Sequence, residues 1–346
     1  MKIKLALLAL AAGAFPPASE AAAAKVQTFT SETKIFREWK AVCDNINNCA
    51  AYGPAEGNTG YVMVKIDAGP EETPRVHAGS YALPSLGGRM DLTIDGRSFT
   101  AEDIQLGSET PVMTFQQPSD DLIRAIGNAR SMSLSSGNEA TAVAVSGAAA
   151  AFLWIDERQG RLGTTTALIR KGDRPASTVP AAPSAPKRVV AAPARLMHRP
   201  QTMPASVFGH EKLTECNARN REPVSANSGW GVYSLGTDTL LWAVPCGMGA
   251  YNTMELYLTS TNEGSNVQAI SFHSSKGSRD ILVNSEFDSA THTISAFNKS
   301  RGPGDCGQNA SWAWNGNIFA LVEENTMEDC FGMHSDLWPS LWRTQG

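Results

Sequence analysis

A proline-rich segment near the middle of the chain sets the strongest limit on what this sequence can fold into. Residues 173–207 hold seven prolines and eight alanines, with almost no large apolar side chain before Leu196. Proline lacks a backbone N–H and alanine buries little surface, so the stretch favours an extended, semi-rigid linker with polyproline character. We therefore predict two domains, residues 33–172 and residues 208–346, each within the size range of a single core.

The linker also differs from the predicted domains in charge. It carries a net charge of +4, against −3 for residues 33–172 and −7 for residues 208–346. Its basic residues are Arg174, Lys187, Arg188, Arg195 and Arg199. A basic segment of this kind could lie on one of the acidic domains or on an anionic envelope surface. A solvated linker is the interpretation that we favour.

The amino terminus has the pattern of an export signal. Lys2 and Lys4 precede an apolar run from Leu5 to Phe15, and small residues follow as far as Ala24. The run is about half of the ~20 residues that a membrane-spanning helix needs, and no second hydrophobic segment follows it. We predict that residues 1–24 are a cleaved signal peptide and that the mature chain is a soluble periplasmic or secreted protein without a transmembrane anchor.

Export changes how the six cysteines are interpreted. An even set in an oxidising compartment predicts disulfides, and zinc is disfavoured because no Cys-x-x-Cys and no helically spaced histidine pair occurs. Two cysteines precede the linker and four follow it, so pairing within domains requires Cys43–Cys49. For the other four we prefer Cys216–Cys246 with Cys306–Cys330, although spacing leaves their pairing open.

Composition and hydrophobic patterning indicate an α+β fold. The chain is 42% apolar, too apolar for a disordered protein, and its net charge of −5 argues against nucleic acid as a partner. Short alternating segments predict β-rich domains on both sides of the linker, and Pro204–Asn217 is the one helical hint after it. Strands do not alternate regularly with helices, so a doubly wound nucleotide-binding sheet is disfavoured.

Two helices are expected before the linker. Ser119 predicts the start of the first, with acidic residues in its first turn and leucine and isoleucine on one face. Ser146 predicts the start of the second, over Ala148–Arg158, and Gly160 stands where a C′ glycine would end it. A β-branched strand is expected over Thr164–Ile169.

Several short motifs together resemble a known family. They are Phe36-Arg37-Glu38-Trp39, Asp156-Glu157-Arg158-Gln159-Gly160-Arg161, Pro245-Cys246-Gly247, Arg301-Gly302-Pro303-Gly304-Asp305-Cys306-Gly307, Trp312-Ala313-Trp314-Asn315-Gly316 and Trp338-Pro339-Ser340-Leu341-Trp342-Arg343. The combination resembles the family catalogued as domain of unknown function 1176, over nearly the whole mature chain. The resemblance implies an exported protein of Gram-negative bacteria and supplies no activity. Pro303 departs from the pattern and stiffens its loop. The N-terminal half shows a fainter resemblance to the invasion-associated locus B family.

The motif that contains Pro303 raises two ligand hypotheses. Residues 302–307 satisfy G-x-G-x-x-G, but a proline removes one N–H and no helix is expected after the motif, so a dinucleotide site is disfavoured. Arg301 beside Asp305 could belong to an anion-binding nest. A tight turn in which Asp305 bonds backbone amides and pairs with Arg301 is the interpretation that we favour.

Two further polar segments are ligand candidates. Arg158 and Arg161, near Asp156 and Glu157, could bind a polar ligand, although cations at a helix C-terminus more often have a structural role. The loop within Cys43–Cys49 carries oxygen ligands for Ca²⁺, yet the same residues are typical of tight turns.

Trp312 and Trp314 form the leading ligand-site candidate. Their period-two spacing places them on one sheet face, where aromatic rings can stack on sugars or peptides. The same spacing suits the core of a small disulfide-linked sheet, and we favour the core.

No catalytic motif is recognisable. G-x-S-x-G is absent and the predicted disulfides leave no free thiol, so we assign no catalytic residue, cofactor or metal. We predict a non-enzymatic envelope protein that binds a protein or glycan partner, with inhibition of an attacking hydrolase such as lysozyme as a narrower form. The alternative is a hydrolase of cell-wall or peptide substrates. It requires one of His77, His273, His292 or His334 to meet both a carboxylate and a serine.

Overall fold

Antiparallel sheets make up most of the structure. The computed structural model describes residues 31–83, 90–101, 103–106, 111–116, 118–196, 199–219 and 223–345, and the predicted signal peptide (residues 1–24) lies outside them. Four α-helices accompany the strands in the described part of the chain, which confirms the predicted β-rich α+β fold class. None of these helices is long and apolar enough to cross a membrane.

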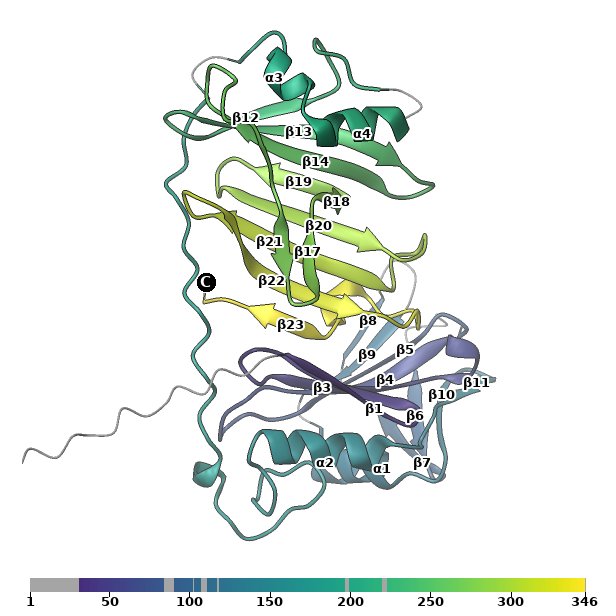
Figure 1. The fold of residues 1–346 in the computed structure, drawn as a ribbon. Coiled ribbons are helices and arrows are strands. Elements are labelled where there is room, and N and C mark those ends of the chain that lie inside the picture. Colours follow the sequence, from purple (N-terminus) through teal and green to yellow (C-terminus); the bar gives the residue numbers. More distant parts are fainter. Residues whose placement is uncertain are drawn as a thin grey trace, which may run out of the picture.

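The N-terminal half contains two sheets (Figure 1). The seven-stranded sheet has the order β1 (Glu32–Phe36), β2 (Trp39–Cys43), β3 (Cys49–Pro54), β4 (Gly60–Ile66), β5 (Arg75–Ser80), β9 (Pro111–Phe115) and β8 (Asp103–Leu106). The four-stranded sheet has the order β11 (Glu139–Ala142), β10 (Met132–Ser136), β6 (Asp91–Ile94) and β7 (Arg97–Thr100). Their apolar faces share one core with two helices, α1 (Asp120–Asn128) and α2 (Ala148–Arg158).

Helix α1 begins as the sequence predicts. The Ser119 hydroxyl accepts a hydrogen bond from the Leu122 amide at 3.2 Å, and Asp120 and Asp121 occupy the first turn. The apolar face of the helix, which includes Leu122 and Ile126, is buried against the sheets. An N-cap of this type stabilises a helix by about 1 kcal/mol.

Helix α2 begins differently from the prediction. Its N-cap is Gly147, in a left-handed conformation (φ 110°), and Ser146 makes no capping bond. A Cβ at Gly147 would lie 1.7 Å from the Phe36 carbonyl oxygen, so close backbone packing requires glycine here. The predicted C′ glycine is confirmed, because Gly160 follows the C-cap with φ 72°.

The predicted strand at Thr164–Ile169 is wrong, because this segment forms turns around the end of α2. The fully buried Asp156 carboxylate accepts hydrogen bonds from the amides of Leu168 and Ile169, at 2.7 and 3.1 Å. A buried carboxylate needs such donors, so the loop gives its N–H groups to Asp156 instead of a sheet ladder.

The C-terminal half is built mainly of two five-stranded sheets. One consists of β12 (Gly231–Gly236), β13 (Thr239–Met248), β14 (Thr253–Ser260) and β15 (Gln268–Ala269), with β18 (Ile281–Val283) also paired to β14. The other has the order β19 (Ser285–Asp288), β20 (Thr293–Lys299), β21 (Gly307–Trp314), β22 (Phe319–Met327) and β23 (Ser340–Arg343). A hairpin and two short helices complete it: β16 (Phe272–Ser274), β17 (Gly277–Arg279), α3 (Ala205–Phe208) and α4 (Glu211–Arg219). The helical hint at Pro204–Asn217 is thus confirmed.

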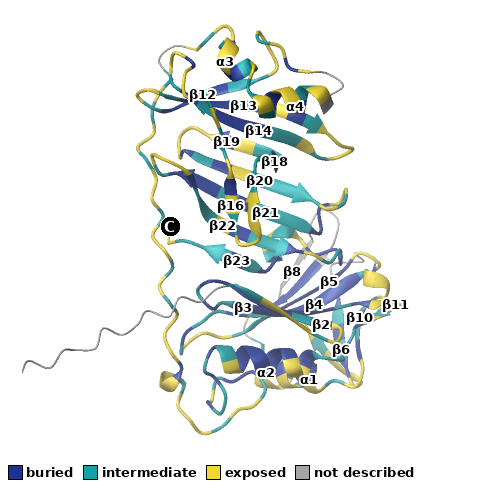
Figure 2. Cartoon of the chain, in the orientation of Figure 1, coloured by how far each residue is buried: buried dark blue, intermediate teal, exposed yellow. Residues whose placement is uncertain are grey.

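A shared apolar cluster joins the two halves. Tyr61 and Met63 of β4 are fully buried in a cluster that also contains Phe331, Met333 and Trp338. Figure 2 shows β3, β4 and β5 coloured mostly as buried, because helices cover one sheet face and the C-terminal half covers the other. The division into two domains at the linker stays a prediction, and the halves are in direct contact.

All three predicted disulfides are confirmed: Cys43–Cys49, Cys216–Cys246 and Cys306–Cys330. The first closes the loop between β2 and β3, the second joins α4 to β13, and the third holds the loop before β21 to the segment after β22. No cysteine in the described part of the chain is free.

Part of the proline-rich segment is docked on the C-terminal half, whereas we favoured a solvated linker, although most described residues of the segment are exposed. Residues 186–194, which we call the strap, run along one side of the β19–β23 sheet (Figure 1). The strap's Ala191 amide donates to the Trp314 carbonyl at 2.8 Å, and Arg188 donates to the Thr293 hydroxyl at 2.7 Å. Farther along, the Ala194 amide donates to Nε2 of the buried His292 at 3.2 Å. An extended chain has its N–H groups free, so it can satisfy acceptors at the strand ends.

The strap's hydrogen bonds predict the effect of a proline substitution. Ala191→Pro removes the N–H that bonds Trp314, so we expect trypsin to cleave at Arg188 and Arg195 about fivefold faster, which corresponds to ~1 kcal/mol. Ala192→Pro is the matched control, because its amide donates no hydrogen bond to any of the residues that the structure describes. Timed digestion followed by mass spectrometry measures both rates. Equal rates for the two variants would contradict the docked arrangement.

Disulfide removal gives a second prediction. The Cys216–Cys246 bond closes a 30-residue separation and Cys43–Cys49 one of only 6, so the longer loop constrains the unfolded chain more. Replacing Cys216 and Cys246 by alanine should lower the free energy of unfolding by roughly 3–4 kcal/mol. Replacing Cys43 and Cys49 should lower it by roughly 2 kcal/mol. Urea unfolding measures both values. An unchanged melting temperature under reductant would count against a stabilising role for all three bonds.

Candidate functional site

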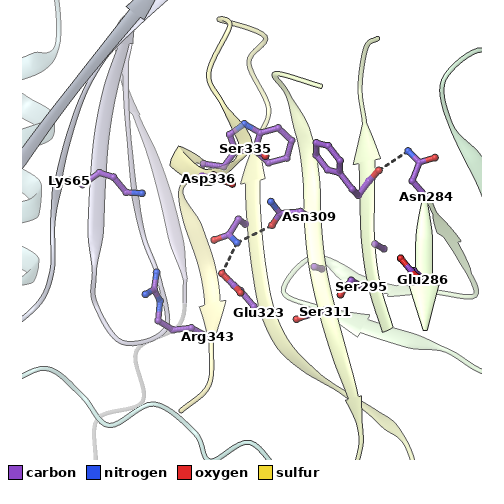
Figure 3. Close-up of a pocket in the computed structure, with 15 residues that line it drawn as sticks. Lys65, Asn284, Glu286, Ser295, Asn309, Ser311, Glu323, Ser335, Asp336 and Arg343 are labelled. Atoms are coloured by element: carbon purple, nitrogen blue, oxygen red, sulfur yellow. Dashed lines mark hydrogen bonds between the residues drawn. The ribbon is translucent and has the colours of Figure 1, made fainter. Parts of the chain in front are cut away.

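A polar cleft of about 650 Å³ lies on the open face of the β19–β23 sheet (Figure 3). Its floor is formed by β19 to β22, and its far wall combines β4, β23 and the short 3₁₀ helix η4 (Ser335–Leu337). The residues that line it are Lys65, Asn284, Glu286, Ser295, Ala296, Phe297, Asn309, Ala310, Ser311, Glu323, Asn325, Ser335, Asp336, Trp338 and Arg343.

Strand register aligns the polar residues of the floor in a row across the sheet. Glu286 pairs with Ser295, which pairs with Ser311, which pairs with Glu323, and Glu323 pairs with Arg343 of β23. Paired residues project to the same face, so hydroxyl, carboxylate and guanidinium groups follow one another at about 4.8 Å per strand.

A second row runs parallel to the first. Phe297 pairs with Asn309, which pairs with Asn325. The side-chain Nδ2 of Asn325 donates at 2.9 Å to both Asn309 Oδ1 and Glu323 Oε1, so it links the two rows. Phe297 packs on the buried Trp338 with ring centroids 5.4 Å apart, and it provides an aromatic surface at one end of the cleft.

The far wall carries two cations. Lys65 Nζ lies 3.4 Å from the Leu337 carbonyl oxygen, and burial, assisted by the charges of Arg75 and Arg343, lowers the Lys65 pKa to about 8. Arg343 Nε forms an ion pair with Asp44 Oδ2 at 2.7 Å. Burial of Asp44 raises its pKa, although Arg343 and two backbone amides oppose the shift.

The Cys43–Cys49 loop holds β23 in place. The Asn45 side chain donates to the Arg343 carbonyl at 3.0 Å and accepts from the Arg343 amide at 2.9 Å. Asp44 Oδ1 accepts from the amides of Ile46 and Asn48, as the turn interpretation requires. In the described residues no group of three or more His, Cys, Asp or Glu side chains is arranged to hold a metal ion.

Trp312 and Trp314 lie on the other side of the sheet from the cleft. Their side chains are 1% and 7% exposed and belong to the core between the two C-terminal sheets. Trp312 Nε1 donates to the His273 carbonyl at 2.6 Å, and Trp314 packs on Phe319. They share one face, as their spacing predicts, but it is the core face and offers no surface to a ligand.

Arg301 and Asp305 form the tight turn that we favoured. Arg301 Nε donates to Asp305 Oδ1 at 2.7 Å, and the Gly332 amide donates to Oδ2 at 2.7 Å. Burial raises the pKa of Asp305, but these hydrogen bonds outweigh it and hold the pKa below its usual value. The carboxylate thus attaches this turn to the segment after Cys330.

Arg158 and Arg161 bind loops of the chain itself. Arg158 Nε donates to Asn47 Oδ1 at 2.9 Å, and its Nη1 pairs with Glu32 at 2.6 Å. Arg161 is fully buried and donates to the Gly69 carbonyl at 2.6 Å. These contacts fit the structural interpretation, and neither arginine lines the cleft.

The four histidines that the hydrolase alternative considers are separated in the fold. His77 contacts Thr114, His273 contacts Ser278, His292 accepts from the strap, and His334 lies beside Asp336. Among the hydrogen bonds and ion pairs of the described residues, none of them meets both a serine hydroxyl and a carboxylate. The geometry required by the hydrolase alternative is therefore not formed by these contacts.

Sequence reasoning missed the cleft residues, although the same alternation contains them. With Trp312 and Trp314 on one face of β21, residues such as Asn309 and Ser311 must project to the other. The sequence alone does not reveal the polar face, because its residues come from separate strands. They become neighbours only through the pairing register of those strands.

The comparisons with known proteins cover nearly the whole of the described chain. A family model described as "Protein of unknown function (DUF1176)" matches residues 33–345. The chain belongs to this family. It is 26% identical over 337 residues to "Uncharacterized protein YpfG" of Escherichia coli (strain K12), covering 90% of this chain and 93% of that relative. No solved structure matches. The resemblance to the invasion-associated locus B family stays a prediction.

Buried His77, on the sheet face that carries Lys65, predicts a pH dependence of stability. Burial, with the charges of Lys65 and Arg75, lowers its pKa to about 4. Its usual pKa is ~6.5, so between these values the unfolded chain binds a proton that the folded chain excludes. The contribution of neutral His77 to the free energy of unfolding is complete above pH 6.5. It falls by roughly 2–3 kcal/mol as the pH decreases to about 4.

Urea unfolding at pH 7 and pH 4.5 tests this effect. His77→Gln should reduce the loss of stability on acidification by about 2 kcal/mol, while His273→Gln, at an exposed site, should leave it unchanged. The same pH dependence in His77→Gln and the native protein would show that His77 does not carry the effect.

Proposed function

We propose that this protein lies in the periplasm and binds a glycan in the cleft of the β19–β23 sheet. The predicted signal peptide and the three disulfides support an exported envelope protein. The observation that carries the proposal is the pair of cross-strand rows, with their amide, hydroxyl and carboxylate groups on one open face.

The chemistry of the rows suits a chain of sugars. Asn309 and Asn325 offer donors and acceptors, Glu323 offers acceptors, and Ser295 and Ser311 offer hydroxyls. Sugar hydroxyl groups both donate and accept, so mixed groups repeated at about 4.8 Å can follow an extended oligosaccharide. Phe297 adds an aromatic ring at one end of the cleft, where the Lys299 ammonium also lies 5.7 Å from the ring centroid.

The cleft is preorganised for binding. Hydrogen bonds from Asn325 hold the side chains of Asn309 and Glu323, and Trp338 supports Phe297 from behind. Side chains that are already ordered lose little conformational entropy when a ligand binds, which favours affinity.

The carboxylates of the floor favour binding over hydrolysis. Glycoside hydrolases place two carboxyl groups about 5–9.5 Å apart. Glu286 and Glu323 occupy strands three intervals apart in the same row, so their backbones are separated by ~14 Å. Strand side chains stand roughly perpendicular to the sheet, so the two carboxyl groups lie comparably far apart, and that separation suits two ligand contacts better than a catalytic pair.

Glycan binding and its dependence on Asn309 are directly testable. We expect the mature protein to bind an oligosaccharide on an array of bacterial envelope glycans. In titration calorimetry with that oligosaccharide, Asn309→Ala should weaken affinity about five- to tenfold, because one hydrogen bond is worth ~1 kcal/mol.

Asn227→Ala, in an exposed loop outside the cleft, is the control and should bind as the native protein does. Melting temperatures confirm that both variants fold. A blank array, or equal affinities for the two variants, would refute binding in this cleft.

A further inference from the structure

The far wall of the cleft carries two basic side chains. Lys65 extends from β4 and Arg343 from β23, and both line the cleft (Figure 3). These residues are 278 positions apart in the sequence, and the contact between the two halves brings them together.

The charge of Lys65 is not neutralised within the described residues. Its Nζ forms no ion pair there, and its recorded partner is the Leu337 carbonyl, at 3.4 Å. The nearby carboxylates of Asp67 and Asp44 are engaged by Arg75 and Arg343, at 2.8 and 2.7 Å. Burial lowers the pKa of Lys65, helped by the charges of Arg75 and Arg343, and the more weakly acting carboxylates of Asp67 and Asp44 do not cancel that effect.

Arg343 is held so that it can serve a ligand. Asp44, which is fully buried, pairs with Nε, and Asn45 fixes the backbone of Arg343. In the described part of the chain no hydrogen bond is recorded for its two Nη groups. A guanidinium anchored through Nε keeps those donors for a carboxylate.

We propose that Lys65 and Arg343 form a carboxylate subsite, so that the cleft selects a glycan bearing a carboxylate over its neutral counterpart. This inference rests on the proposed glycan-binding function. The ammonium and the guanidinium donate charge-assisted hydrogen bonds to the ligand's carboxylate, while its neutral sugars follow the two polar rows.

The acidic residues of the cleft limit the number of carboxylates that fit. Glu286, Glu323 and Asp336 also line it, and all three are exposed. They would repel a ligand with a carboxylate on every sugar. The expected ligand class is therefore a glycan with isolated carboxylates, such as those on lactyl ether substituents, separated by neutral sugars.

The test compares one glycan with and without its charge. The probes are glycan strands of peptidoglycan freed of their peptides, used with native lactyl carboxylates and again after conversion to methyl esters. We expect the native protein to bind the acid form at least tenfold more tightly by titration calorimetry. Lys65→Met should lose this preference while still binding the ester as the native protein does.

Matched variants separate charge from structure. Lys65→Arg should retain the preference, Arg343→Gln should reduce it, and Lys276→Met, an exposed lysine outside the cleft, should leave it unchanged. Melting temperatures identify any variant that fails to fold, and Lys65→Arg then decides the outcome.

The possible failures are distinguishable. If the native protein binds the acid and the ester equally, the carboxylate subsite is overturned while glycan binding stands. If Lys65→Met weakens both forms equally, Lys65 is structural and the subsite is again overturned. Binding of neither form, together with a blank glycan array, overturns the proposed function as well.

Discussion

The rest of the structure depends on one apolar contact. It joins the segment that follows β22 to the face of the seven-stranded sheet that the helices do not cover. Tyr61 and Met63 are fully buried there, against Met333 and Trp338. Each large apolar side chain removed from water contributes about 2 kcal/mol, so the contact is worth many times the thermal energy. It also explains why β4 is buried along nearly its whole length, on both faces. The proline-rich segment could not fix this arrangement by itself, because an extended chain sets only a maximum distance.

The cleft follows from that contact. Its floor belongs to the β19–β23 sheet, but Lys65 comes from the N-terminal sheet and Arg343 is positioned by Asp44. The Cys43–Cys49 loop therefore has two roles, since it closes a hairpin and orients a cation of the candidate site. One face of the β19–β23 sheet is core and the other is open and polar, which gives the sheet both stability and a binding surface.

Sequence reasoning succeeded where the determinant is local. Ser119 caps α1 through its own hydroxyl, Gly160 ends α2 in a conformation that glycine tolerates, and the cysteines pair within the segments that the linker separates. It failed where a distant group decides. Gly147 caps α2 because the Phe36 carbonyl packs against it, and Thr164–Ile169 gives its amides to Asp156 instead of a strand. The strap was expected to be solvated because its acceptors lie far away in sequence, for example 105 residues from Arg188 and 98 from Ala194.

The sequence by itself determined the β-rich class, the Cys43–Cys49 pair, the extended character of residues 186–194 and the family, because these depend on residue type, spacing and short-range pattern. The tertiary structure decided which face of each strand is open. Trp312 and Asn309 alternate on one strand, and nothing local states which of them meets solvent. That choice is made by the partner sheet, which buries the larger apolar area on the tryptophan side and leaves the polar rows to form the cleft.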